Sequence, residues 1–189
     1  MNKDHIRNTR NIVSQYLNRY IKEDDICLDA TIGNGNDINR IAKLVGENGK
    51  VYGFDIQALA INNTKKTLMA QDIIDRVILI KDSHEHIDTY IEEKLNFIIY
   101  NLGYLPKGDK NIKTNEKSTI ISINKALNLM ASGSIMLITT YTGHPGGSSE
   151  DKAVNEFLSS LDQRVFNIVK YDFINQMNNP PILYAVEKL

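Results

Sequence analysis

A buried strand that runs into a glycine turn constrains this chain more than any other feature. Residues 26–28 (Ile-Cys-Leu) form a short apolar run, and Gly33 and Gly35 follow it within seven positions. Glycine has no Cβ atom, so it allows a tight turn and lets the main chain approach a ligand closely. Apolar residues at helical spacing follow the turn and stop at Gly46. The pattern predicts a strand, a tight turn and a helix over 37–45.

Asp55 lies twenty positions after Gly35, at the end of the apolar segment 51–54. The carboxyl ends of parallel strands meet at one edge of a sheet, so Asp55 should lie beside the glycine turn. A carboxylate in that place can accept two hydrogen bonds from a ribose diol. The spacing therefore indicates a site for an adenosine-containing cofactor. The alternative is an ordinary strand-turn-helix unit in which Asp55 is a solvated strand end.

The turn differs from a dinucleotide-binding turn at two positions. A dinucleotide fingerprint needs a third glycine at position 38, and this chain has Ile38 there. Asp29 would repel a pyrophosphate, but it suits an ammonium group that binds directly or through water. These features favour S-adenosylmethionine, which has a ribose and an amino-acid end but no phosphate.

The third predicted strand ends at Asp82. Asp82 is placed to meet an adenine amino group, although Asp82 and Ser83 are also ordinary caps for a following helix. We expect the cofactor-binding residues to come from the glycine turn and the strand ends: Asp29, Thr31, Gly33, Asn34, Gly35, Asn36, Asp37, Asp55, Ile56, Gln57, Asp82, Ser83, His84 and Asn101.

Strand and helix patterns alternate along the chain, which predicts an α/β fold with a doubly wound, mostly parallel sheet. The predicted strands lie at 26–31, 51–56, 77–82, 97–102, 134–141, 165–171 and 182–186, and the helices at 4–20, 37–45, 57–70, 84–93, 116–131 and 149–161. The connection between the last two strands contains Pro180 and Pro181 and is too short for a crossover helix. Those strands should therefore form an antiparallel hairpin.

This pattern resembles the class I methyltransferase fold, which is Rossmann-like and has an antiparallel last strand in a seven-stranded sheet. The 189 residues fit a single domain, 1–189, with an additional N-terminal helical extension over 1–22. We expect Asn36 or Asp37 to cap the helix at 37–45, and Ser148 or Ser149 to cap the helix at 149–161.

Composition excludes several other classes of protein. No segment has the length and hydropathy of a membrane span, and the charged N-terminus lacks a signal-peptide pattern, so we expect a cytoplasmic protein without a membrane partner. Cys27 is the only cysteine, which excludes an internal disulfide and a cysteine-based zinc site. His84 and His86 are two positions apart and would not share a helix face, so we predict no metal site.

The net charge of −1 is not typical of a protein that holds nucleic acid by bulk attraction. Nucleic-acid binding would have to be local. The chain has two basic patches, and charge alone favours solvated surfaces over binding sites for both: Lys3, Arg7, Arg10 and Arg19, and then Lys107, Lys110, Lys113 and Lys117.

The fourth predicted strand ends at Asn101, which Leu102, Gly103 and Tyr104 follow. This segment is similar to the Asn-Pro-Pro-Tyr segment of amino-group methyltransferases, with Leu102 and Gly103 in place of the prolines. In such a site the Asn carbonyl accepts hydrogen bonds from the target amine. The alternative is a strand-terminating turn with Tyr104 in the core. We predict Asn101 and Tyr104 as catalytic residues.

A loop with three glycines and a proline follows the fifth predicted strand. Its histidine, His144, is the third predicted catalytic residue, because it is the only histidine in a glycine-rich loop at a strand's carboxyl end. His144 is also a candidate to accept a proton from the substrate through a water molecule. Glu150 should lie in the first turn of the next helix.

Three segments, at 29–37, 101–109 and 141–150, resemble the small bacterial methyltransferases known as putative rRNA methylases. The resemblance implies that Asp29, Gly33, Gly35, Asp55 and Asp82 contact the cofactor, and that Asn101, Tyr104 and His144 lie on the substrate side. Asn36-Asp37-Ile38 replaces the His-Asp-Thr that is common in the family.

The family includes a tRNA methyltransferase, so the resemblance implies methylation of 5-aminomethyl-2-thiouridine at the wobble position of a tRNA anticodon stem-loop. Action on rRNA, a small molecule or a protein amine stays open, as do a non-enzymatic nucleotide-binding module and an NAD-dependent oxidoreductase. Both a monomer and a homodimer are compatible with the sequence.

An alkylammonium has a pKa of about 10.4 in water, so the target amine must lose a proton before it attacks the methyl group. Burial and the nearby sulfonium charge lower that pKa. We therefore expect the site to act more by orientation than by base catalysis.

Overall fold

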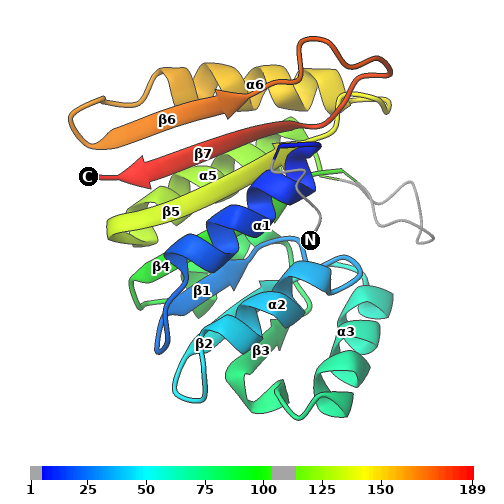
Figure 1. Ribbon diagram of the computed structural model, residues 1–189, viewed down its shortest axis with the longest axis vertical. Coiled ribbons are helices and arrows are strands. Elements are labelled where there is room, and N and C mark those ends of the chain that lie inside the picture. The colour runs from blue at the N-terminus through cyan, green and yellow to red at the C-terminus, as the bar shows by residue number, and fades with distance from the viewer. Residues whose placement is uncertain (1–5, 104–113) are drawn as a thin grey trace.

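The computed structural model describes residues 6–103 and 114–189, which form a seven-stranded sheet in the order β3-β2-β1-β4-β5-β7-β6 (Figure 1). The first five strands are parallel, and β7 runs antiparallel to both β5 and β6. This arrangement confirms the predicted topology. In chain order the strands are β1 (Ile26–Asp29), β2 (Lys50–Phe54), β3 (Val77–Ile80), β4 (Leu95–Asn101), β5 (Met130–Thr140), β6 (Phe166–Tyr171) and β7 (Ile182–Lys188).

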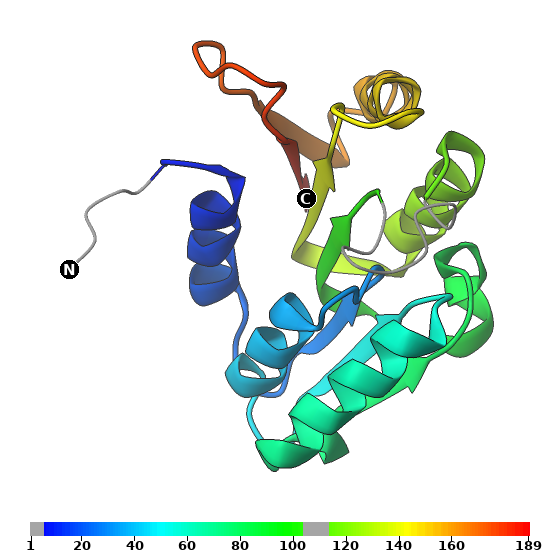
Figure 2. The same ribbon diagram turned by 90° about the vertical axis from the view of Figure 1, so that its right-hand side faces the viewer.

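Helices cover both faces of the sheet (Figures 1 and 2). One face packs against α1 (Thr9–Tyr20), α2 (Asn36–Leu44) and α3 (Ala58–Ala70). The other packs against α4 (Ile87–Tyr90), α5 (Glu116–Leu129) and α6 (Gly147–Ser159). Two short 3-10 turns, η1 (Ile74–Arg76) and η2 (His84–His86), lie before and after β3.

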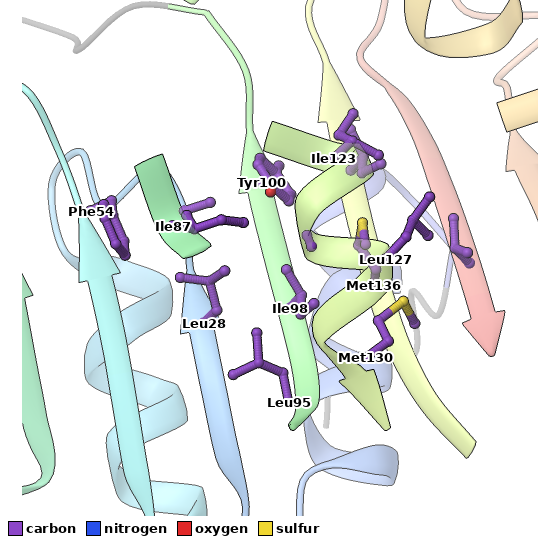
Figure 3. Close-up of a cluster of buried hydrophobic side chains, with 14 of the residues drawn as sticks. Leu28, Phe54, Ile87, Leu95, Ile98, Tyr100, Ile123, Leu127, Met130 and Met136 are labelled. Carbon is purple, nitrogen blue, oxygen red and sulfur yellow. The ribbon is translucent and has the colours of Figure 1, made fainter. Parts of the chain in front are cut away.

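Alternation along each central strand supplies the two halves of the core. Successive side chains of a strand point to opposite faces. In β4, Phe97 and Ile99 pack on the side of α1 and α2, whereas Ile98 and Tyr100 pack on the side of α5. Both sides of the strand are fully buried, as is typical of parallel sheets. Figure 3 shows the α5 side, where Ile98 and Tyr100 of β4 belong to one cluster with Ile123 of α5.

Cys27 is fully buried in β1, and burial raises the pKa of its thiol. None of the helices formed by residues 6–103 and 114–189 combines the length and the apolar character needed to cross a membrane.

The predicted helix over 84–93 is wrong. The chain forms η2 and then a single turn of α-helix, and it leaves the helical conformation at Ile91. Ile91 and Leu95 are both buried, so the segment after Tyr90 must extend along the core to enter β4. Packing of these two side chains ends the helix early.

The predicted helix caps are wrong as well. Gly35 and Gly146 occupy the N-cap positions of α2 and α6, with φ of 76° and 90°. Asn36, Asp37, Ser148 and Ser149 therefore make no side-chain cap. The tight turns before both helices require positive φ at the cap position, which glycine adopts without strain. Glu150 does lie in the first turn of α6, as predicted.

The N-terminal helix begins at Thr9, where Asn8 caps it by accepting a hydrogen bond from the Asn11 N–H (3.0 Å). The first residues of the predicted helix, 4 and 5, lie outside the described residues. Ile12, Val13 and Leu17 bury one face of α1 against the sheet.

Leu17→Ala tests whether α1 is part of the cooperative core. Leu17 is fully buried, so its truncation should lower the free energy of unfolding by about 3 kcal/mol. Lys66→Ala, an exposed position on α3, should change it by less than about 0.5 kcal/mol. Urea unfolding followed by circular dichroism measures both. A loss below about 1 kcal/mol for Leu17→Ala would show that α1 is only loosely attached.

Candidate functional site

A cavity of about 1010 Å³ opens at the carboxyl edge of the sheet. It lies over the neighbouring strands β1 and β4, where the order of the strands reverses. Ligands of open α/β sheets bind at such a switch point, because the loops that leave the two strands turn toward opposite faces. Figure 2 looks onto this edge, with α1 and α2 on one face and α5 and α6 on the other.

The glycine turn forms one wall of the cavity. Gly33 and Gly35 have φ of 53° and 76°, in the left-handed region that favours glycine. The Gly35 N–H donates to the Ile32 carbonyl (2.9 Å) and closes the turn. A Cβ atom at Gly35 would lie 2.5 Å from Oγ1 of Thr64 in α3, so α3 leaves no room for a side chain there. Gly33 lines the cavity, whereas Gly35 is buried and does not.

Asp55 follows β2 directly and lines the cavity. Its Oδ2 accepts a hydrogen bond from the Gly33 N–H (3.0 Å), and its Oδ1 accepts one from the Gln57 N–H (2.8 Å). Burial raises the pKa of Asp55. Carboxylate oxygens have further lone pairs, so Asp55 can also accept hydrogen bonds from ligand hydroxyls.

Asp29, at the end of β1, is 1% exposed and does not line the cavity. Its Oδ1 accepts a hydrogen bond from the Thr31 N–H (3.1 Å), whereas Oδ2 has no partner among the described residues. Burial, and then the nearby charge of Asp37, raise the pKa of Asp29 to about 8. Asp29 is therefore protonated at pH 7 and would gain most from a cation that compensates its charge.

Asp82 and Ser83 both line the cavity after β3. Oδ1 of Asp82 accepts from the Ser83 N–H (2.7 Å), and Oδ2 accepts from the Tyr90 hydroxyl (2.8 Å). Ser83 also caps η2 through the Glu85 N–H. His84, which lines the cavity too, is 8% exposed, and burial lowers its pKa to about 4, so its ring is neutral at pH 7.

Asn101, the last residue of β4, is held at two points. Its backbone N–H donates to Oγ1 of Thr31 (2.6 Å), and its side-chain Nδ2 donates to Oδ2 of Asp37 (2.8 Å). None of the hydrogen bonds among the described residues uses Oδ1 of Asn101. The amide therefore has an acceptor to offer at the cavity that it lines.

His144 lies close to two glycines on the other side of the cavity. Cβ atoms at Gly103 and Gly147 would lie 3.4 and 3.1 Å from its Nε2, so the absence of side chains there makes room for the ring. Tyr141, which follows β5 directly, lines the cavity beside it, and burial raises the pKa of Tyr141. Tyr104, predicted to complete this side, lies outside the described residues.

The structure brings most of the predicted residues together around one cavity. Asp29 and Gly35 are buried at its edge without lining it. The predicted residues that line it are Thr31, Gly33, Asn34, Asn36, Asp37, Asp55, Ile56, Gln57, Asp82, Ser83, His84, Asn101 and His144.

Three further segments that the sequence analysis missed also line the cavity. The first is α1, with Thr9, Arg10 and Val13, the second is the β6–β7 connection, with Asn179 and Pro181, and the third is the start of α5 and the residues before it, with Thr114, Asn115 and Ser118. A signal for the second segment existed, because an antiparallel last strand must begin at the carboxyl edge of the other strands. Nothing in the sequence shows where α1 packs. Tyr141 could have been found by the strand-end rule that identified Asn101.

Among the described residues of the N-terminal basic patch, Arg10 lines the cavity, and the separate Arg40 from α2 lines it too. Arg40 also donates to the Ser14 carbonyl (3.0 Å), which ties α2 to α1. Arg19 lies at the opposite end of α1, with its guanidinium over the ring of Tyr20. Four lysines of the two patches lie outside the described residues: Lys3, Lys107, Lys110 and Lys113.

Unpaired buried polar atoms gather around this cavity. Asp29 Oδ2, His84 Nδ1 and Thr139 Oγ1 have no hydrogen-bond partner among the described residues. Buried polar groups are normally paired, so three such atoms in one place fit a site that receives polar ligand groups. Within 6–103 and 114–189, no cluster of three or more His, Cys, Asp and Glu side chains is placed to hold a metal ion.

Asp29→Asn tests the protonated state of Asp29. Unfolded, this carboxyl ionises near pH 3.9, whereas in the folded protein its pKa is about 8. Between these two pKa values the folded state binds one proton more than the unfolded state. The free energy of unfolding therefore falls by up to about 1.4 kcal/mol per pH unit as pH rises. The variant stays neutral and lacks this loss. The stability of Asp29→Asn relative to wild type should therefore rise from about pH 5 to 7.5 in denaturant titrations without added ligand.

Asp75→Asn provides the control for this measurement, because Asp75 lies in η1 at the opposite edge of the sheet. Its stability relative to wild type should stay constant over the same range. A constant difference for Asp29→Asn would contradict the buried, protonated carboxyl.

Known proteins are similar to this chain in both sequence and fold. A family model described as "Putative rRNA methylase" matches residues 51–187. A chloroplastic tRNA (mnm(5)s(2)U34)-methyltransferase from Arabidopsis thaliana is 31% identical over 179 residues, which is 89% of this chain. The chain spans 65% of that relative's length.

Two solved structures match over nearly the whole chain. A putative rRNA methylase from Clostridium thermocellum is 46% identical with a TM-score of 0.95, over 97% of this chain and 99% of that one. A putative methyltransferase from Streptococcus mutans, solved in complex with SAH, is 35% identical with a TM-score of 0.89, over 97% and 99%. The fold is the class I methyltransferase fold, and the chain belongs to the putative rRNA methylase family.

Proposed function

We propose that this protein transfers a methyl group from S-adenosylmethionine to the amine of 5-aminomethyl-2-thiouridine at the wobble position of tRNA, acting as a single domain over 1–189 in the cytoplasm. The observation that carries the proposal is the position and the hydrogen bonding of the Asn101 side chain. This neutral amide stands at the strand switch point, its nitrogen bonded to Asp37 and its oxygen without a partner among the described residues. Such an oxygen is suited to accept a hydrogen bond from an amine.

The chain's residues fit the cofactor. Asp55 has lone pairs to offer a ribose diol. Asp82 follows the neighbouring strand β3 and lines the same cavity, where its carboxylate can accept a hydrogen bond from an adenine amino group. Asp29 offers a buried, unpaired oxygen for an ammonium group, directly or through water. The Streptococcus mutans relative was solved with SAH, the demethylated product of this cofactor. S-adenosylmethionine supplies an electrophilic methyl group on a sulfonium sulfur.

The chain's own task is to hold the acceptor amine without its proton and with its lone pair toward that methyl group. Oδ1 of Asn101 accepts one amine hydrogen, which leaves the lone pair free to point elsewhere. Tyr141 and His144 line the same side of the cavity and enclose the amine. Enclosure removes water, which lowers the pKa of an ammonium group because it disfavours the charged form.

The choice of tRNA rests on the Arabidopsis relative, whose name specifies the wobble uridine. A cavity of this volume has room for a nucleobase beside a cofactor, and Arg10 supplies a positive charge at its wall. Methylation of rRNA, a small molecule or a protein amine is the second candidate. The net charge of −1 favours the small molecule and the protein amine, which are not nucleic acids.

Nucleoside analysis tests the substrate. Total tRNA from a strain that lacks this protein should accumulate 5-aminomethyl-2-thiouridine, and addition of purified protein with labelled S-adenosylmethionine should convert it to 5-methylaminomethyl-2-thiouridine. Mass spectrometry of digested tRNA measures both changes. An unchanged nucleoside profile, with label entering rRNA or a protein fraction instead, would support the second candidate.

Asn101→Ala tests the acceptor role. The variant should lower the turnover number at least 100-fold, because the amine loses its positioning acceptor, while the Kd for SAH changes less than about threefold. Asn124→Ala, an exposed position on α5, should match wild type in both measurements. Parallel loss of turnover and SAH binding in Asn101→Ala would indicate a role in cofactor binding or folding.

A further inference from the structure

We propose that Asp37 is a positioning residue for methyl transfer, whose carboxylate determines which end of the Asn101 amide faces the cavity. The inference rests on the proposed function, which assigns the acceptor amine to Asn101. Asp37 lies in the first turn of α2 and Asn101 at the end of β4, so the contact joins two elements that are 64 positions apart.

An amide side chain has two ends of similar size, and either end fits the same space. One end is an oxygen that accepts hydrogen bonds, and the other is an NH₂ group that donates them. Only the end with the oxygen can receive the hydrogen of a substrate amine. A site that depends on an asparagine oxygen therefore needs a neighbour that excludes the flipped amide.

Asp37 provides that neighbour, because an ionised carboxylate accepts hydrogen bonds and donates none. Its Oδ2 lies 2.8 Å from Nδ2 of Asn101, a distance typical of a charge-assisted hydrogen bond. A flipped amide would place two acceptor oxygens against each other. The carboxylate thus turns Oδ1 of Asn101 away from α2 and leaves it for the acceptor amine.

The backbone of Asn101 is held independently. Its N–H donates to Oγ1 of Thr31 (2.6 Å), and the Leu102 N–H donates to the Thr139 carbonyl (2.9 Å). With the main chain fixed on both sides, the rotation of the amide is the main freedom that remains. Among the described residues Asp37 is the hydrogen-bond partner of that amide, so its replacement should affect the orientation of the amide more than its position.

Asp37→Asn is the most informative variant, since it keeps the shape of the side chain and removes its acceptor-only character. An asparagine at position 37 can also donate to Oδ1 of Asn101 and occupy the oxygen that the amine needs. We expect the turnover number to fall at least tenfold at saturating S-adenosylmethionine, with the Kd for SAH changed less than threefold. Asp37→Glu keeps a carboxylate and should recover part of the activity. Asp75→Asn should equal wild type.

A double-mutant cycle with Asn101→Ala separates this role from a structural one. If Asp37 acts through Asn101, then Asp37→Asn should lower turnover less than twofold in the Asn101→Ala background. Independent, multiplicative losses would overturn the proposal, and so would a raised Kd for SAH with wild-type turnover. Thermal unfolding of each variant checks its folding, and Asp37→Glu keeps the test open if Asp37→Asn is unstable.

The acceptor for this cycle is whichever substrate the wild-type protein methylates. If that acceptor is not tRNA, the proposed substrate fails, yet the cycle still decides the role of Asp37 on the acceptor found. If Asn101→Ala itself retains full turnover, the positioning role of Asp37 is overturned directly.

Discussion

The reversal of strand order between β1 and β4 is the constraint on which the site depends. At this point the Ala30 N–H donates to the Ile99 carbonyl (2.9 Å), and beyond it Thr31 accepts a hydrogen bond from the Asn101 N–H. The loops that leave the two strands turn to opposite faces and open the cavity between them. Asp37 then joins α2 to β4 across this opening. The wall proposed for the cofactor and the residue proposed for the acceptor are therefore positioned by one continuous set of hydrogen bonds.

The sheet and most of the cavity are predictable from the sequence because short segments of the chain determine them. A continuous apolar run such as Phe97 to Tyr100 identifies a strand that is buried on both faces, and a fixed topology then places each strand end at one edge. Features decided by tertiary packing were not predictable in this way. The packing of α1 over the cavity, the early end of α4 at Ile91, and the glycine caps each depend on contacts between distant segments. Asp29 belongs to both groups. Its place at the end of β1 was predictable from the sequence motif, whereas its complete burial depends on tertiary packing.

Burial makes ionisation of Asp29 unfavourable, and a cationic ligand can remove this penalty. A carboxyl group beneath the glycine turn, near Asp37, holds its proton because the charged form lacks water and faces another negative charge. An ammonium group nearby would supply the missing counter-charge and favour ionisation. The same burial that penalises the ionised folded protein thus strengthens its attraction for a cationic ligand, since electrostatic interactions are stronger away from water. The buried carboxyl group of Asp29 thus lowers the folding stability of the protein but raises its affinity for a cationic ligand, a trade-off that is common in functional sites.

A net charge of −1 limits how such a protein can recognise RNA. Nonspecific affinity grows with the number of phosphates that Lys and Arg neutralise. Among the described residues, Arg10 and Arg40 are the arginines that line the cavity, and Arg40 is already engaged with α1. Two such charges can orient an RNA strand, but they cannot bind it tightly or select its sequence. For the proposed tRNA substrate, selection would then come from the cavity itself, where an amide acceptor beside an acidic side chain favours a nucleobase that bears an amine over one that bears none.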